Sequence, residues 1–146
     1  MKKTIFLLTV IFCGISSVFL LAVFSENKTS PDDVYEVLSS KGFKDETPLF
    51  CQIKTGGVTK NINQDVPILF KVIKKAVVTE SSPEPSAYVI YLENGSSLES
   101  QRIVISISKT GNGYVEYIGK KLVFFKSLEL YDFCVAAFNK SEIIIS

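Results

Sequence analysis

The segment AYVIYLENGSSLESQRIVISISK, residues 87–109, decides the fold class because it holds two strand patterns separated by a turn signal. Ile103, Ile105 and Ile107 alternate with Val104 and two serines. A period of two places these isoleucines on one face of a strand. Asn94-Gly95 is a favoured turn dipeptide between strands. The segment therefore predicts an antiparallel hairpin, or nearly one.

Further strand patterns lie on both sides of this hairpin. Residues 49–54 alternate and place Cys51 on an apolar face, and Gly56-Gly57 follows as a hairpin-type turn. Residues 66–80 are rich in β-branched residues and predict a strand, whose start Pro67 restricts to an edge or bulge. The remaining strand patterns are residues 88–93, 103–108, 114–118, 122–126 and 142–145. Seven or eight short strands predict a mainly β (α+β) fold built on an antiparallel sheet, sandwich or small barrel.

Residues 127–140 fit two patterns. If the segment is a strand, its first leucines alternate with polar residues. If it is a helix, one apolar face consists of Leu128, Tyr131, Val135 and Phe138. We favour a strand as far as Cys134.

One short helix is expected before the strands, over residues 31–41. Ser30 is a good N-cap, Pro31 suits the first helical position, and Asp33 completes a capping box. Gly42 fits the left-handed position after the helix, with Phe43 packing back. An apolar stripe faces the rest of the domain and consists of Val34, Val37 and Leu38.

Residues 5–24 form an uncharged run of twenty residues preceded by Lys2 and Lys3. As a helix this run spans about 30 Å, the thickness of a bilayer core. A lipoprotein signal is excluded, because Phe12 is too large to precede a lipidated Cys13. A cleaved signal, with Val23 and Ser25 before the cut, and a retained anchor both stay open, and length favours the anchor.

Both alternatives place the rest of the chain outside the cytoplasmic membrane, secreted, periplasmic or membrane-anchored, because positive charge before the run stays in the cytoplasm. The expected organisation is a signal or membrane segment over residues 1–25, a linker with the short helix over 26–46, and a β domain over 47–146.

Charge and composition exclude several classes of function. After Ser25 the chain has 14 basic and 15 acidic residues, so it lacks the basic surface that nucleic acids require. Histidine is absent, which removes histidine-dependent nucleophiles and histidine metal ligands. We expect no cofactor, no metal and no enzymatic activity. The alternative is an enzyme that acts through carboxylates, with a general-acid pair supplied from among Glu93, Glu99 and Glu116.

Two cysteines lie in the predicted β domain, Cys51 and Cys134. In an exported domain, two cysteines indicate one disulfide. Two buried free thiols are the alternative.

The second half resembles the membrane-bound inhibitors of C-type lysozyme, which are small exported β-barrel proteins. The resemblance rests on four stretches: Phe50-Cys51, the loop Thr110-Gly111-Asn112-Gly113-Tyr114, the aromatic strand Leu122–Lys126, and the late Cys134. The chain departs from that family at Ser127, which stands where the family has glycine, in lacking tryptophan, and over residues 58–86.

The resemblance implies that Thr110 and Lys126 enter a lysozyme active site, that Gly111 and Tyr114 belong to the same partner-binding surface, and that the early and late cysteines are bonded. Taken with the exclusions, the sequence predicts an exported, non-enzymatic β domain that binds a protein or small ligand in the cell envelope. The alternatives are a lysozyme-inhibitor-like protein and the carboxylate enzyme.

Overall fold

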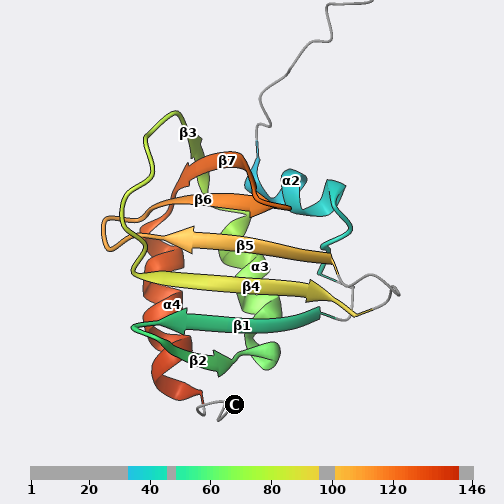
Figure 1. Ribbon diagram of the computed structural model, residues 1–146, viewed down its shortest axis with the longest axis vertical. Coiled ribbons are helices and arrows are strands. Elements are labelled where there is room, and N and C mark those ends of the chain that lie inside the picture. The colour runs from blue at the N-terminus through green and yellow to red at the C-terminus, as the bar shows by residue number, and fades with distance from the viewer. Residues whose placement is uncertain (1–32, 46–48, 96–100, 142–146) are drawn as a thin grey trace, which may run out of the picture. The chain divides into compact units, whose positions relative to one another are not determined.

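In the described part of the chain, an antiparallel sheet of seven strands forms the centre of the domain (Figure 1). The computed structural model describes residues 33–45, 49–95 and 101–141. The strand order is β2-β1-β4-β5-β6-β7-β3, so β2 and β3 are the edges of an open sheet. The strands are β1 Leu49–Thr55, β2 Val58–Asn61, β3 Val77–Thr79, β4 Tyr88–Asn94, β5 Gln101–Ile107, β6 Asn112–Tyr117 and β7 Lys120–Lys126.

The predicted central hairpin is confirmed. Strands β4 and β5 pair along their whole length, from Tyr88 opposite Ile107 to Asn94 opposite Gln101. Ile103, Ile105 and Ile107 are fully buried on one face. The hairpin turn at Gly56-Gly57 is also confirmed, because both glycines have the positive φ that a type I′ turn requires.

Three α-helices accompany the sheet in the described part of the chain: α2 Val34–Ser40, α3 Val66–Ile73 and α4 Leu128–Lys140. A 3-10 turn, Asn63–Asp65, leads into α3. Helices α3 and α4 both lie behind the sheet in Figure 1 and cover one of its faces. The core is the apolar layer between that face and the helices, and α2 contributes Val34, Val37 and Leu38 to it.

The predicted end of helix α2 at Gly42 is confirmed, but its N-cap is Asp33. Asp33, in extended conformation, is the N-cap, and its carboxylate accepts a hydrogen bond from the Tyr35 N–H at 2.8 Å. The predicted cap Ser30 and Pro31 lie outside the described residues. At the other end, Gly42 has φ +83° and the Phe43 N–H donates to Leu38 O at 3.0 Å, which closes a Schellman motif.

The strand predicted for residues 66–80 is wrong over its first half, where helix α3 forms. Pro67 lies in the first turn of this helix, where a missing N–H costs nothing. The buried residues follow a helical spacing: Val66, Leu69, Phe70, Val72 and Ile73. Only Val77–Thr79, after the helix, forms a strand.

The preference for a strand up to Cys134 is also wrong, because Leu128–Lys140 is helix α4. Ser127 caps it by accepting a hydrogen bond from the Leu130 N–H at 3.1 Å. The buried stripe is Leu130, Cys134 and Ala137, whereas Leu128 is exposed. One short helix was expected, and the structure has two more, α3 and α4, in segments for which we predicted strands.

A close approach inside the sheet requires glycine at position 113. A Cβ at Gly113 would lie 2.4 Å from Ser106 O and 2.5 Å from the Phe125 ring. The bare backbone lets the Phe125 side chain, which is fully buried, cross over β6. Gly113 therefore leaves room for the Phe125 ring against β6, whereas an alanine at position 113 would collide with that ring.

The expected membrane or signal run at residues 5–24, Cys13, and the short strand at 142–145 all lie outside the described residues. In the part of the chain that the structure describes, no helix is long and apolar enough to cross a membrane.

Candidate functional site

The face of the sheet opposite the helices carries no helix of the described chain (Figure 1). We call it the outer face. Apart from the buried Ser106, its side chains are half-buried or exposed. It consists of Phe50, Gln52, Lys54, Val89, Tyr91, Glu93, Arg102, Val104, Ser106, Tyr114, Glu116 and Phe124.

Aromatic rings and basic side chains are paired on the outer face. The guanidinium carbon of Arg102 lies 5.3 Å from the centre of the Tyr91 ring, and Arg102 also donates to Oε1 of Glu93. The Lys121 ammonium lies 4.5 Å from the Tyr114 ring centre, and Tyr114 packs edge-on against Phe124. These contacts restrict the positions of the rings on the outer face.

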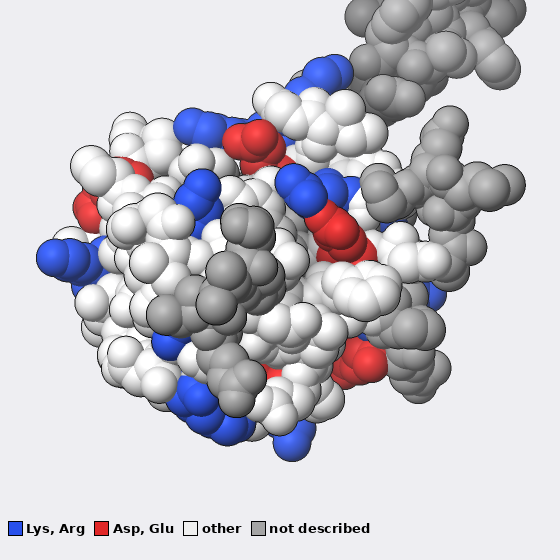
Figure 2. Space-filling model, turned by 60° about the horizontal axis from the view of Figure 1, so that its bottom comes forward, with Lys and Arg blue, Asp and Glu red and all other residues white. Residues whose placement is uncertain are grey.

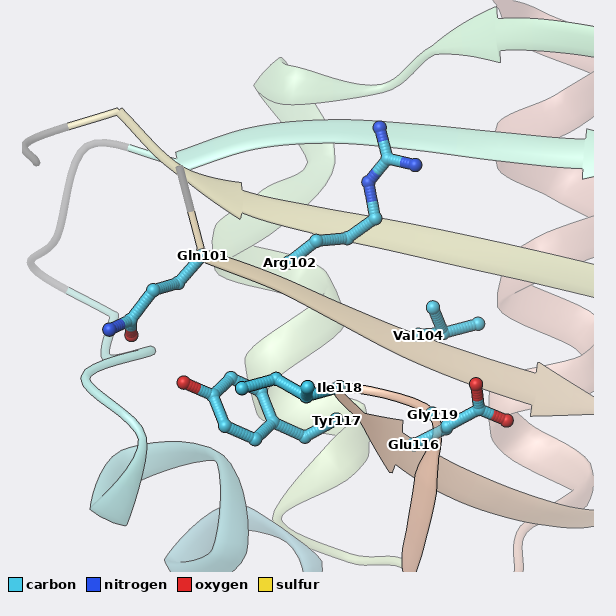
Figure 3. A pocket seen from close by; sticks show the side chains of 7 residues that line it. All are labelled: Gln101, Arg102, Val104, Glu116, Tyr117, Ile118 and Gly119. Carbon is cyan, nitrogen blue, oxygen red and sulfur yellow. The ribbon is translucent and has the colours of Figure 1, made fainter. Parts of the chain in front are cut away.

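A pocket of about 400 Å³ lies at one end of the outer face, where β5 meets the β6–β7 turn (Figure 3). Arg102 and Glu116 lie on either side of Val104 in this view, and Ile118 borders the pocket. Arg102 is engaged by Glu93, whereas Glu116 has no ion pair among the described residues. The pocket thus has a mixed lining, in which the Glu116 carboxylate lies near the polar Gln101 and the apolar Val104 and Ile118.

Ile118 is the most exposed large apolar side chain of the described chain, at 77%. Its φ is +49°, a left-handed conformation that β-branched residues rarely adopt. With Gly119 at φ +70°, it forms a two-residue type I′ turn, for which Asn or Gly is the usual choice. Strain of this kind concentrates at functional sites. The strand predicted for residues 114–118 included Ile118, whereas the structure places this residue in the turn.

Two of the predicted partner-binding residues, Thr110 and Lys126, interact with Glu84 at the other end of the outer face. Thr110 Oγ1 donates to Oε2 of Glu84, and Asn112 Nδ2 donates to Oε1 of Glu84 at 2.7 Å. These bonds, first that from Thr110, lower the pKa of Glu84, and the charge of Lys126 lowers it further. Thr110 and Lys126 therefore both act on one carboxylate, which belongs to the loop between β3 and β4.

Gly111 and Tyr114 have separate tasks. Gly111 has φ +83°, and a Cβ there would lie 3.0 Å from Leu128 N, so glycine fixes the turn against the start of α4. Tyr114 lies in the middle of β6 on the outer face. Gly111 is therefore structural, whereas Tyr114 is half-buried against Lys121 and Phe124.

The expected disulfide is absent from the structure: Cys51 and Cys134 are both free and buried. Cys51 faces the helices from β1, and Cys134 faces the sheet from α4. Burial raises the pKa of Cys134 to about 12. Burial also raises the pKa of Cys51, with smaller contributions from Cys134 and Asp65. Both thiols are therefore protonated and unreactive at neutral pH.

The candidate carboxylates of an enzyme are only partly brought together. Glu93 and Glu116 share the outer face on β4 and β6, but Glu93 is held by Arg102. Glu99 lies outside the described residues. Within the described ranges, no group of acidic or cysteine side chains has the arrangement of a metal site.

Charges of both signs are mixed over the molecular surface. On the side seen in Figure 2, basic and acidic groups are scattered among uncharged surface, and some groups of opposite sign lie next to one another. Such a surface has no single-sign field to attract a polyanion.

Comparison with known proteins finds no matching family model, no similar curated protein and no similar solved structure.

Proposed function

We propose that this chain is a non-enzymatic binding domain and that the outer face docks a protein partner. The observation that carries the proposal is an aromatic-rich sheet face without a covering layer in the described structure. Tyrosine, phenylalanine and arginine are enriched in protein interfaces. The face presents all three types, with Phe50 exposed at 58%.

The location outside the cytoplasmic membrane is part of the same proposal. It is supported by the two lysines before the uncharged run at residues 5–24. If the run at residues 5–24 is retained as an anchor, the domain meets other membrane-held proteins at a raised effective concentration.

Site-specific photo-crosslinking in the cells that make the protein tests this function. Benzoylphenylalanine replaces Phe50 or Tyr91 on the outer face, and Lys71, exposed on α3, serves as the matched control position. We expect one discrete adduct from the two outer-face positions and none from Lys71. We also expect Val104→Glu to suppress the adduct and Lys71→Glu to leave it intact. An adduct of equal yield from Lys71, or none from either outer-face position, contradicts the proposal.

A second candidate function, lysozyme inhibition, is favoured by one specific contact. Lysozymes act through two carboxyl groups. The family resemblance assigns Thr110 and Lys126 to the lysozyme active site. Here Thr110 donates a hydrogen bond to the carboxylate of Glu84, and the charge of Lys126 lowers the pKa of that carboxyl group. The pair therefore has the chemistry to receive a carboxylate, and Glu84 occupies it within the chain.

Lysis assays with C-type lysozyme test this candidate. If Glu84 competes with the enzyme, Glu84→Ala inhibits lysis more strongly than the unmodified protein, and Lys126→Ala abolishes the inhibition. The candidate function is excluded if neither the unmodified protein nor either variant slows lysis at micromolar concentration.

A further inference from the structure

A surface groove of about 400 Å³ lies between helices α3 and α4. Its walls are apolar: Ile68 and Val72 come from α3, and Phe133, Ala136 and Ala137 come from α4. Ile68 is exposed at 50%, although it is a large aliphatic side chain. The two alanines on the opposite wall leave the space that a larger side chain would fill.

An ion pair joins the two helices at each end of the groove. Lys140 donates to Asp65 at 2.9 Å at one end, and Lys75 donates to Glu129 at 2.7 Å at the other. Because the start of α3 meets the end of α4, the helices are antiparallel. The two pairs therefore set the length of the apolar stretch between them.

The groove carries an excess of negative charge. Three carboxylates line it, from Asp65, Glu129 and Asp132. Lys140 pairs with the first and Lys75 with the second, so the excess is the one charge of Asp132. Asp132 makes no ion pair with any described residue. The side chain of Asp65 is only 6% exposed, and its Oδ2 is buried without a hydrogen-bond partner among the described residues. A buried carboxylate oxygen without a donor is rare in proteins.

We propose that this groove binds a small organic cation, in which an aromatic or aliphatic body carries one ammonium group. The apolar body lies between Ile68 and Ala136, where it removes both from water. The ammonium group pairs with Asp132, the carboxylate on the rim that has no partner in the described chain. The volume falls within the range of ligand pockets. This site lies on the helical side of the domain, so it is independent of partner docking on the outer face.

Methyl NMR on the full-length chain tests the proposal, with phenethylammonium as the probe and hydrocinnamate, its anionic counterpart of similar shape, as the control. We expect phenethylammonium to shift the methyl signals of Ile68, Ala136 and Ala137 in a saturable way. Hydrocinnamate should bind at least about ten-fold more weakly. Asp132→Asn should weaken phenethylammonium binding by about two- to five-fold, the range of one exposed ion pair.

A matched pair of variants separates groove binding from partition into detergent or membrane. Ala136→Trp fills the groove from an exposed position and should abolish the shifts of Ile68. Asn139→Trp places the same side chain on the same helix outside the groove and should retain them. Equal binding of the cation and the anion overturns the proposal, as does unchanged binding in Ala136→Trp. Methyl shifts that depend on protein concentration without any probe also overturn it, because a second copy then covers the groove.

Discussion

Lys140, the last residue of α4, donates a hydrogen bond of 2.9 Å to Oδ1 of Asp65, the residue before α3. The carboxylate is almost fully buried, whereas the lysine side chain is 61% exposed. Removing the lysine leaves a buried charge without a donor, which costs more than the bond itself contributes.

Lys140→Met is therefore expected to lower the free energy of unfolding by about 1–3 kcal/mol, less than for a fully buried pair because Lys140 reaches water. Urea denaturation measures the change. The control is Lys75→Met, which breaks the exposed pair with Glu129 and should cost less than about 1 kcal/mol. Equal losses in the two variants contradict the assigned role of Asp65.

Glu84 predicts a pH dependence of stability. Its folded pKa is lowered, first by the hydrogen bond from Thr110, then by that from Asn112. A carboxyl group with a lowered folded pKa stabilises the protein above its unfolded pKa, and that contribution disappears as the pH falls through the folded value. Thermal midpoints of the unmodified protein and Glu84→Gln should therefore differ at pH 7. The difference should begin to shrink near pH 4.5, the ordinary pKa, and vanish below the lowered folded pKa.

The exposed Glu80 of the same loop provides the comparison for Glu84. Glu80→Gln should follow the unmodified protein over the whole pH range. If the thermal midpoints of Glu84→Gln and the unmodified protein differ by the same amount from pH 7 to pH 3, the charge of Glu84 is not what stabilises the protein.

The strands could be predicted from the sequence because their pattern is local. Ile103, Ile105 and Ile107 reveal the buried face without any knowledge of the neighbouring strands. Helix α3 could not, because β-branched residues such as Val66 and Val72 favour strands, while their burial follows a helical period. In a short apolar run both periods fit, and the need to cover the inner face of the sheet decides between them.

The candidate site was less predictable than the fold. Tyr114 could be placed on a strand, but which face lacks a cover depends on where α3 and α4 pack, a tertiary property. The contact between Thr110 and Glu84 joins residues 26 positions apart, through a loop with no pattern of its own. The resemblance singled out Thr110 and Lys126, and the structure adds the carboxylate that they share.

Cys51 and Cys134 predict slow thiol chemistry. In a Cys13→Ser background, iodoacetamide at pH 8 should leave both cysteines unmodified in the folded protein, because burial keeps the thiols protonated. Alkylation should increase with urea in parallel with unfolding, as counted by mass spectrometry. Since unfolded thiols ionise near pH 8.5 and the folded ones do not, stability should decrease as the pH rises above about 9. Fast alkylation of either cysteine in the native protein contradicts their burial.

We expect a substitution at Ile118 to have opposite effects on the stability of the protein and on partner binding. Because φ is +49° at this position, Ile118→Asn should relieve left-handed strain and raise the free energy of unfolding by about 1 kcal/mol. The same change at Ile68, which is exposed on the regular helix α3, should give no such gain. If the exposed isoleucine is retained for docking, Ile118→Asn should also weaken the photo-crosslink from Tyr91. Urea denaturation and crosslink yield measure the two effects, and a stabilised variant with an undiminished crosslink shows that Ile118 takes no part in partner binding.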